Sequence, residues 1–192
     1  MFRNMSPEKT LTPGYTVIYP NRDKAVSKAT KAIVILILLV SVGLMLIVTI
    51  GGWSKLQGLK PVNLAWCLVY LIVAFYIARW KRGLLPIAAA LAILLLMISV
   101  IAGTGASGTS WFDRNTGGFA APHSLFGSKG LGPDVLGTVT LLIAPVQILL
   151  IFFAMRGFMQ GWNVEVEVPI DEARRRGSKP PEGSPPPQPA AA

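Results

Sequence analysis

The chain has 192 residues, of which 52% are hydrophobic and only 14% are charged, and its formal net charge is +9. Because about a quarter of the residues in soluble domains are charged, this composition excludes an ordinary soluble protein and is typical of an integral membrane protein. The excess of Lys and Arg lies beside apolar runs and forms no basic-aromatic module, so we expect it to set the orientation in the membrane. Nucleic acid is therefore not an expected partner.

Residues 1–31 are polar and basic and are predicted to form a cytoplasmic segment. Within it, the sequence YTVIY at 15–19 is typical of a short strand. The apolar run that follows is too long for a signal-peptide core and is not followed by a small-residue cleavage site. We interpret it as a first membrane span over 32–50, with Trp53 as an anchor in the headgroup region.

The second and third predicted spans, 62–80 and 84–102, are separated by a short basic turn that consists of Arg79, Trp80, Lys81, Arg82 and Gly83. Each apolar run is roughly 25 to 30 Å long as a helix, which is the thickness of a hydrocarbon core. Positive charges in short loops favour the cytoplasmic side, so this turn sets the predicted topology. Trp66 and Trp80 are expected at the two interfaces of the second span.

Residues 103–133 are predicted to form a long extracytoplasmic loop. Connections of this length are usually functional or disordered. The loop is rich in glycine but also contains large aromatic side chains, so we expect it to lie on the bilayer surface or on a partner. The predicted contact residues are Trp111, Phe112, Phe119, His123 and Phe126.

The fourth predicted span covers 135–155, with Asp134 as the expected helix N-cap, Pro145 as an internal kink and Trp162 as a further interface anchor. In the juxtamembrane segment 156–176, positions 164–168 alternate with period two, as in a strand. We predict that this strand pairs with 15–19, because both lie on the cytoplasmic side and neither has another partner. The composition of 177–192, rich in Pro and Ala, is typical of disorder.

The sequence thus predicts an all-α membrane protein. It has four transmembrane helices, cytoplasmic N and C termini, a long extracytoplasmic loop between the third and fourth helices, and a short cytoplasmic two-stranded pairing. Small residues on the third span, among them Ala88, Ala89 and Ala92, favour close packing on a neighbouring helix. Gly43 is interpreted as a further close helix contact.

Few residues could support chemistry. The sequence GTGASG at 103–108 has the spacing of a dinucleotide-binding loop, but it follows a membrane span instead of a strand, so we interpret it as an exit from the third span. A single histidine, His123, cannot form a bis-histidine haem site or a multi-histidine zinc site. Cys67 is interpreted as a packing residue. No catalytic site, metal or cofactor is expected.

Polar side chains within the predicted spans are uncharged. Gln147, Thr140 and Ser99 either line a small polar cavity or form contacts between helices, and the interhelix contact is the favoured interpretation for Gln147. Glycines at 157 and 161 either permit close helix packing or terminate the fourth helix, and termination is favoured.

The leading functional hypothesis is an accessory or structural subunit that packs against other integral membrane subunits. The alternative is a small transporter or channel for an uncharged or lipid-like solute, with a cavity near Gln147. An enzyme that acts on lipid is the weakest hypothesis, because its acid and base groups would have to come from the outer loop. The expected location is a bacterial plasma membrane, and a eukaryotic internal membrane stays open.

Overall fold

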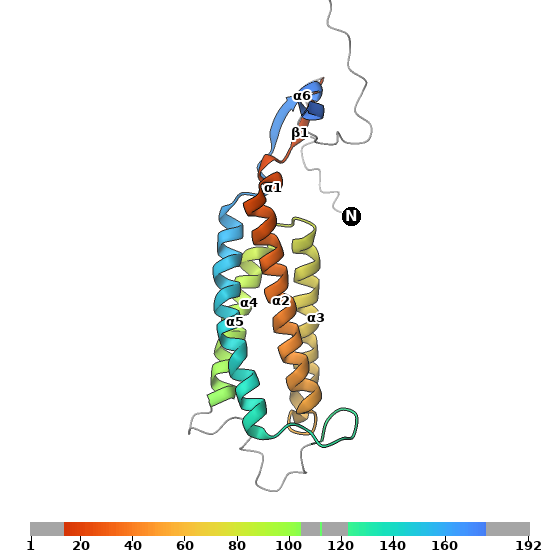
Figure 1. Cartoon of the computed structure of the whole chain (residues 1–192), viewed down its shortest axis with the longest axis vertical. Helices are drawn as coiled ribbons and strands as arrows, with labels where there is room; N and C mark the ends of the chain where they lie inside the picture. The colour runs from red at the N-terminus through yellow and green to blue at the C-terminus, as the bar shows by residue number, and fades with distance from the viewer. Residues whose placement is uncertain (1–13, 105–111, 113–122, 176–192) are drawn as a thin grey trace, which may run out of the picture.

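A computed structural model describes residues 14–104, 112 and 123–175 of the chain. Its main body is a bundle of four long helices, shown in Figure 1, which are α2 (Ala25–Gly51), α3 (Lys60–Ala78), α4 (Leu84–Thr104) and α5 (Pro133–Met159). All four are long and apolar enough to cross a membrane, which fits the predicted multi-pass membrane protein.

The two ends of this bundle differ in charge and in the length of their connections. The basic end carries Arg79, Lys81 and Arg82 in the turn between α3 and α4. The loop end is the opposite one, where α4 stops at Thr104 and α5 starts at Pro133. The elements that precede α2 and follow α5 both lie at the basic end (Figure 1), as they must when four helices cross in alternation.

The helix bounds differ from the predicted spans by a few residues at most ends, most of all at the start of α2 and at the end of α5, which continues to Met159. α2 begins at Ala25, inside the polar segment, so Lys28 and Lys31 lie on its first turns. The prediction that Asp134 is the N-cap of α5 is wrong, because Gly132 is the N-cap and Pro133 occupies the first turn. Proline suits this position, since its missing N–H would have no partner there, and Asp134 still places its negative charge near the positive end of the helix dipole.

The helices pack unequally. α4 packs mainly on α5, α5 also packs on α2, and α2 packs on α3, whereas the consecutive helices α3 and α4 contact each other much less than these pairs do. Ala88, Ala89 and Ala92 of α4 are all buried, as predicted for a close-packed small-residue face. A Cβ atom on Gly103 would come within 3.0 Å of Leu141, so α4 and α5 also approach closely at the loop end. The α3–α4 side is therefore the loosely closed side of the bundle.

The predicted pairing of the two short strands is confirmed. β1 (Tyr15–Ile18) and β2 (Val166–Pro169) form an antiparallel sheet in which Thr16 pairs with Val168. α1 (Pro20–Asp23) connects β1 toward α2, and α6 (Ile170–Arg175), which was not predicted, follows β2 directly. Ile18, Val168 and Ala173 form a small buried cluster between the sheet and α6. Figure 1 shows this unit beyond the basic end of the bundle.

Candidate functional site

A chain of hydrogen bonds links three helices inside the bundle. The Tyr70 hydroxyl on α3 donates to Oε1 of Gln147 on α5 at 2.8 Å. Nε2 of Gln147 donates to Oγ of Ser41 on α2 at 2.9 Å, and that hydroxyl donates to the carbonyl of Ile37. All three side chains are completely buried. Gln147 thus forms a contact between helices, the favoured one of its two predicted roles, and its partners Tyr70 and Ser41 were not identified from the sequence.

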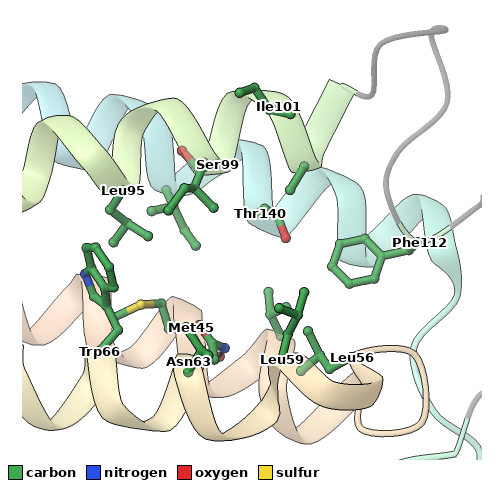
Figure 2. Close-up of a pocket in the computed structure, with 15 residues that line it drawn as sticks. Met45, Leu56, Leu59, Asn63, Trp66, Leu95, Ser99, Ile101, Phe112 and Thr140 are labelled. Atoms are coloured by element: carbon green, nitrogen blue, oxygen red, sulfur yellow. Dashed lines mark hydrogen bonds between the residues drawn. The ribbon is translucent and has the colours of Figure 1, made fainter.

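A separate apolar pocket of about 370 Å³ lies on the α3–α4 side, toward the loop end (Figure 2). Its walls come from all four helices, and the lining side chains include Met45, Val62, Trp66, Leu95, Ile98 and Ile143. The pocket exists because α3 and α4 are held together by the turn at the basic end but pack chiefly on other helices along the rest of their length. Gln147 is not part of its lining.

Phe112 closes the loop end of this pocket (Figure 2). Its ring is only 2% exposed and packs in a cluster with Val48, Leu56 and Leu136. We expected Phe112 to contact a partner or the bilayer surface. It instead belongs to the core of its own chain, because the gap between the helix ends offers a large apolar ring more burial than the surface does.

The other two predicted polar residues, Ser99 and Thr140, both line the pocket. Ser99 donates to the carbonyl of Leu96 within its own helix, at 2.9 Å. The hydroxyl of Thr140 is buried and has no hydrogen-bond partner among the described residues. In Figure 2 its oxygen points into the pocket, toward the side formed by Leu59. Asn63, also in the lining, donates to the hydroxyl of Thr49.

The predicted contact residues of the outer loop are only partly described. Trp111 and Phe119 lie outside the described residues. The His123 N–H donates to Oγ of Ser54 at 2.8 Å, and the Ser54 N–H donates to the His123 carbonyl, so the backbone at His123 is attached to the turn after α2. Phe126 is 81% exposed and is available for contact at this end.

The aromatic anchors divide into two groups. Trp53, Trp66 and Trp80 are partly exposed, as membrane-interface residues are. The prediction of an interface anchor at Trp162 is wrong, since this side chain is completely buried. Gly161 has a positive φ of 61°, which reverses the chain and brings the Trp162 ring edge-on against Trp80, at 5.3 Å between centroids.

The basic turn has structural contacts that the sequence did not indicate. Nε of Arg82 donates to the carbonyl of Phe158 at 2.7 Å, near the C-terminus of α5. Lys31 donates to the carbonyl of Ala78 at the C-terminus of α3, and its ammonium lies 3.8 Å from the centre of the Trp80 ring. Cations at these positions interact favourably with helix carboxyl ends, so the charges also stabilise the bundle.

Within the described part of the chain, no three His, Cys, Asp or Glu side chains are grouped so that they could hold a metal ion. What the structure does provide is a paired polar network, an apolar pocket with one unpaired hydroxyl, and a small sheet at the basic end. Comparisons with protein-family models, with curated proteins and with solved structures find no match to this chain.

Proposed function

We propose that the protein is an accessory or structural subunit of a larger membrane assembly and that the unit formed by β1, β2 and α6 is its docking element. The observation that carries this proposal is the sheet itself, which both ends of the described chain build and which extends beyond the basic end (Figure 1). A two-stranded sheet is marginally stable in water, so a chain that forms one needs packing partners for it.

Hydrogen bonds join the two segments that connect the docking element to the bundle. The amide of Asn21 donates to the carbonyl of Gly161, and Nε of Arg22 donates to the carbonyl of Trp162 at 3.1 Å. Nη2 of Arg22 also donates to Oδ1 of Asn163. These bonds join the segment before α2 to the segment after α5. The sheet therefore projects in a fixed direction, as a docking element should.

One face of the sheet is available to a partner. α6 covers the face that carries Ile18 and Val168, and alternation along the strands places Tyr15 and Val17 on the opposite face. Tyr15 is 42% exposed, and exposed tyrosines are enriched where proteins bind each other. Among the described residues β1 and β2 pair only with each other, so each also has an open edge that can accept a further strand.

We further propose that the basic end is cytoplasmic and that the membrane is a bacterial plasma membrane. The support is the positive-inside rule, which places Arg79, Lys81 and Arg82 inside. With this orientation the docking element is in the cytoplasm, where a partner subunit can reach it.

The test is affinity purification of the tagged full chain from its own membranes in mild detergent, followed by mass spectrometry. Val17→Lys adds a charge to the uncovered face of the sheet while facing Glu167, its cross-strand neighbour of opposite charge, so the sheet itself is preserved. Asp171→Asn changes the net charge in the same sense on the exposed surface of α6 and is the matched control.

We expect a defined set of membrane proteins to copurify with the wild type and with Asp171→Asn, and to be lost with Val17→Lys. Recovery of the wild type as a lone monomer would contradict the subunit proposal. Equal recovery with both variants would show that the partners bind elsewhere.

A second candidate function is a transporter or channel for an uncharged or lipid-like solute, and the pocket between α3 and α4 is the observation that favours it. The pocket is bounded by Phe112 at the loop end, and Gln147 and its partners Tyr70 and Ser41 lie outside its lining. These features favour the binding of a solute in the pocket over its passage across the membrane. If Ala102→Phe, which fills the pocket, left the flux of every tested solute through reconstituted vesicles unchanged, the transport hypothesis would lose its main support.

A further inference from the structure

We propose that the pocket between α3 and α4 binds one acyl chain of a membrane phospholipid, and that the hydroxyl of Thr140 donates a hydrogen bond to the ester carbonyl of that lipid. This inference is independent of the subunit proposal, which concerns the opposite end of the molecule.

The pocket opens sideways, into the membrane. Its rim carries side chains that face outward on both helices, since Val62 of α3 is 57% exposed and Ile98 and Ile101 of α4 are 51% and 63% exposed. These helices cross the membrane, so the medium at this opening is lipid. An acyl chain can enter without leaving hydrocarbon, and the volume of about 370 Å³ falls at the small end of ligand sites.

Thr140 supplies the polar contact that distinguishes a binding site from a gap. Its side chain is 7% exposed, and its Oγ1 has no partner among the described residues. Six other Ser and Thr hydroxyls of the described helices donate to a carbonyl of their own helix three or four residues earlier; these are Thr30, Ser41, Thr49, Ser99, Thr104 and Thr138. The hydroxyl of Thr140 could donate to a carbonyl of its own helix in the same way, but it points into the pocket instead (Figure 2). An unpaired buried hydroxyl is costly in lipid, so an acceptor in the pocket is expected.

The depth of Thr140 identifies the acceptor. α5 has 27 residues and is about 40 Å long, roughly 10 Å longer than a hydrocarbon core. Thr140 lies two turns into this helix, close to the boundary of that core. In Figure 2 it lies across the pocket from Leu59 and Asn63, at the start of α3. Lys60, on the same turn, has its ammonium 4.7 Å from the centre of the Trp53 ring, a pair of side-chain types typical of the membrane interface. Ester carbonyls of phospholipids are the acceptors found at this level.

The experiment uses native mass spectrometry of the delipidated full chain in mild detergent, titrated with palmitoyl-oleoyl phosphatidylglycerol. A parallel titration uses its diether analogue, which has the same headgroup but no ester carbonyl. We expect the wild type to retain one lipid and to bind the diester about threefold more tightly than the diether, the ratio that an average hydrogen bond between membrane groups supplies.

Two pairs of variants separate the pocket from the rest of the lipid-facing surface. Ala102→Phe fills the pocket and should remove the retained lipid, whereas Ala90→Phe places the same side chain on an exposed position of α4 and should have no effect. Thr140→Val should abolish the preference for the diester, whereas Thr138→Val, whose hydroxyl is bonded to the carbonyl of Asp134, should keep it.

The proposal is overturned if Ala102→Phe retains lipid as the wild type does, or if the diester preference persists in Thr140→Val. It is also overturned if the wild type retains no lipid. Thermal unfolding of each variant in the same detergent shows whether a loss of lipid reflects a loss of fold, and Thr140→Val keeps the test decisive even if Ala102→Phe does not fold.

Discussion

The Tyr70 hydroxyl and the Gln147 amide oxygen are 2.8 Å apart, with both side chains completely buried between α3 and α5. The same amide donates to Ser41 on α2, so one glutamine fixes the relative positions of three helices. Leaving a buried polar group unpaired costs about 1 to 3 kcal/mol, whereas a bond formed between membrane helices contributes on average under about 1 kcal/mol. The network therefore specifies the packing of the helices more than it adds to their stability.

Gln147→Leu should lower the free energy of unfolding by about 1 to 2 kcal/mol, because it removes two interhelix bonds and leaves the Tyr70 hydroxyl without its acceptor. Tyr70→Phe should cost less in the Gln147→Leu background than in the wild type, since the partner is already absent. Reversible unfolding in mixed micelles measures all four proteins. Additive effects of the two changes would show that the bond does not contribute.

This network also marks the limit of the sequence analysis. The spans and the paired strands could be predicted, because continuous apolar runs and period-two alternation are local signals. An interhelix contact of Gln147 could be predicted from its polarity within an apolar span, but Ser41 and Tyr70 are far from it along the chain. No local sequence pattern indicates which helices are neighbours in the bundle, so the partners of Gln147 could not be identified.

Substitution by alanine should have opposite effects on the free energy of unfolding at two glycine positions. A Cβ on Gly157 would lie 3.2 Å from both Leu85 and Trp162, whereas a Cβ on Gly43 would meet nothing within 4 Å. Gly157→Ala should therefore lower the unfolding free energy by about 1 kcal/mol or more through overpacking. Gly43→Ala should be neutral or raise it by up to about 1 kcal/mol, because alanine favours the helix. Unfolding of both variants in the same micelles measures the contrast.

The surroundings of these two glycines differ from those predicted. The interpretation of Gly43 as a close helix contact is wrong, because the space beside it is open. Gly157 is a packing residue and Gly161, with its positive φ, reverses the chain after α5, so the two glycines have different roles. Burial of Trp162 and Phe112 was missed for a related reason. The position of each ring depends on a chain reversal or on a loop, and the hydropathy of the sequence indicates neither.

The bonds from Arg22 to Trp162 and Asn163 should control the stability of the docking element. Arg22→Ala removes both bonds, so the sheet should open more often and hydrogen exchange of the amides in 15–18 and 166–168 should speed up several-fold. Exchange in α2 to α5 should stay unchanged. Lys24→Ala, an exposed neighbour, is the control and should leave the sheet as protected as in the wild type. Unchanged protection in Arg22→Ala would show that the sheet is held by other contacts.

The orientation in the membrane can be tested by cysteine labelling, because Cys67 is the single cysteine and is buried. In a Cys67→Ala background, Phe126→Cys places a thiol at a position that is 81% exposed at the loop end, and Asp171→Cys places one on the exposed surface of α6 beyond the basic end. If the positive-inside rule decides the topology, a membrane-impermeant maleimide should label Phe126→Cys in intact cells and Asp171→Cys only after permeabilisation. The reverse pattern would place the docking element outside the cell. In that case no cytoplasmic partner could reach Tyr15 and Val17, and the proposed lipid would belong to the inner leaflet instead of the outer one.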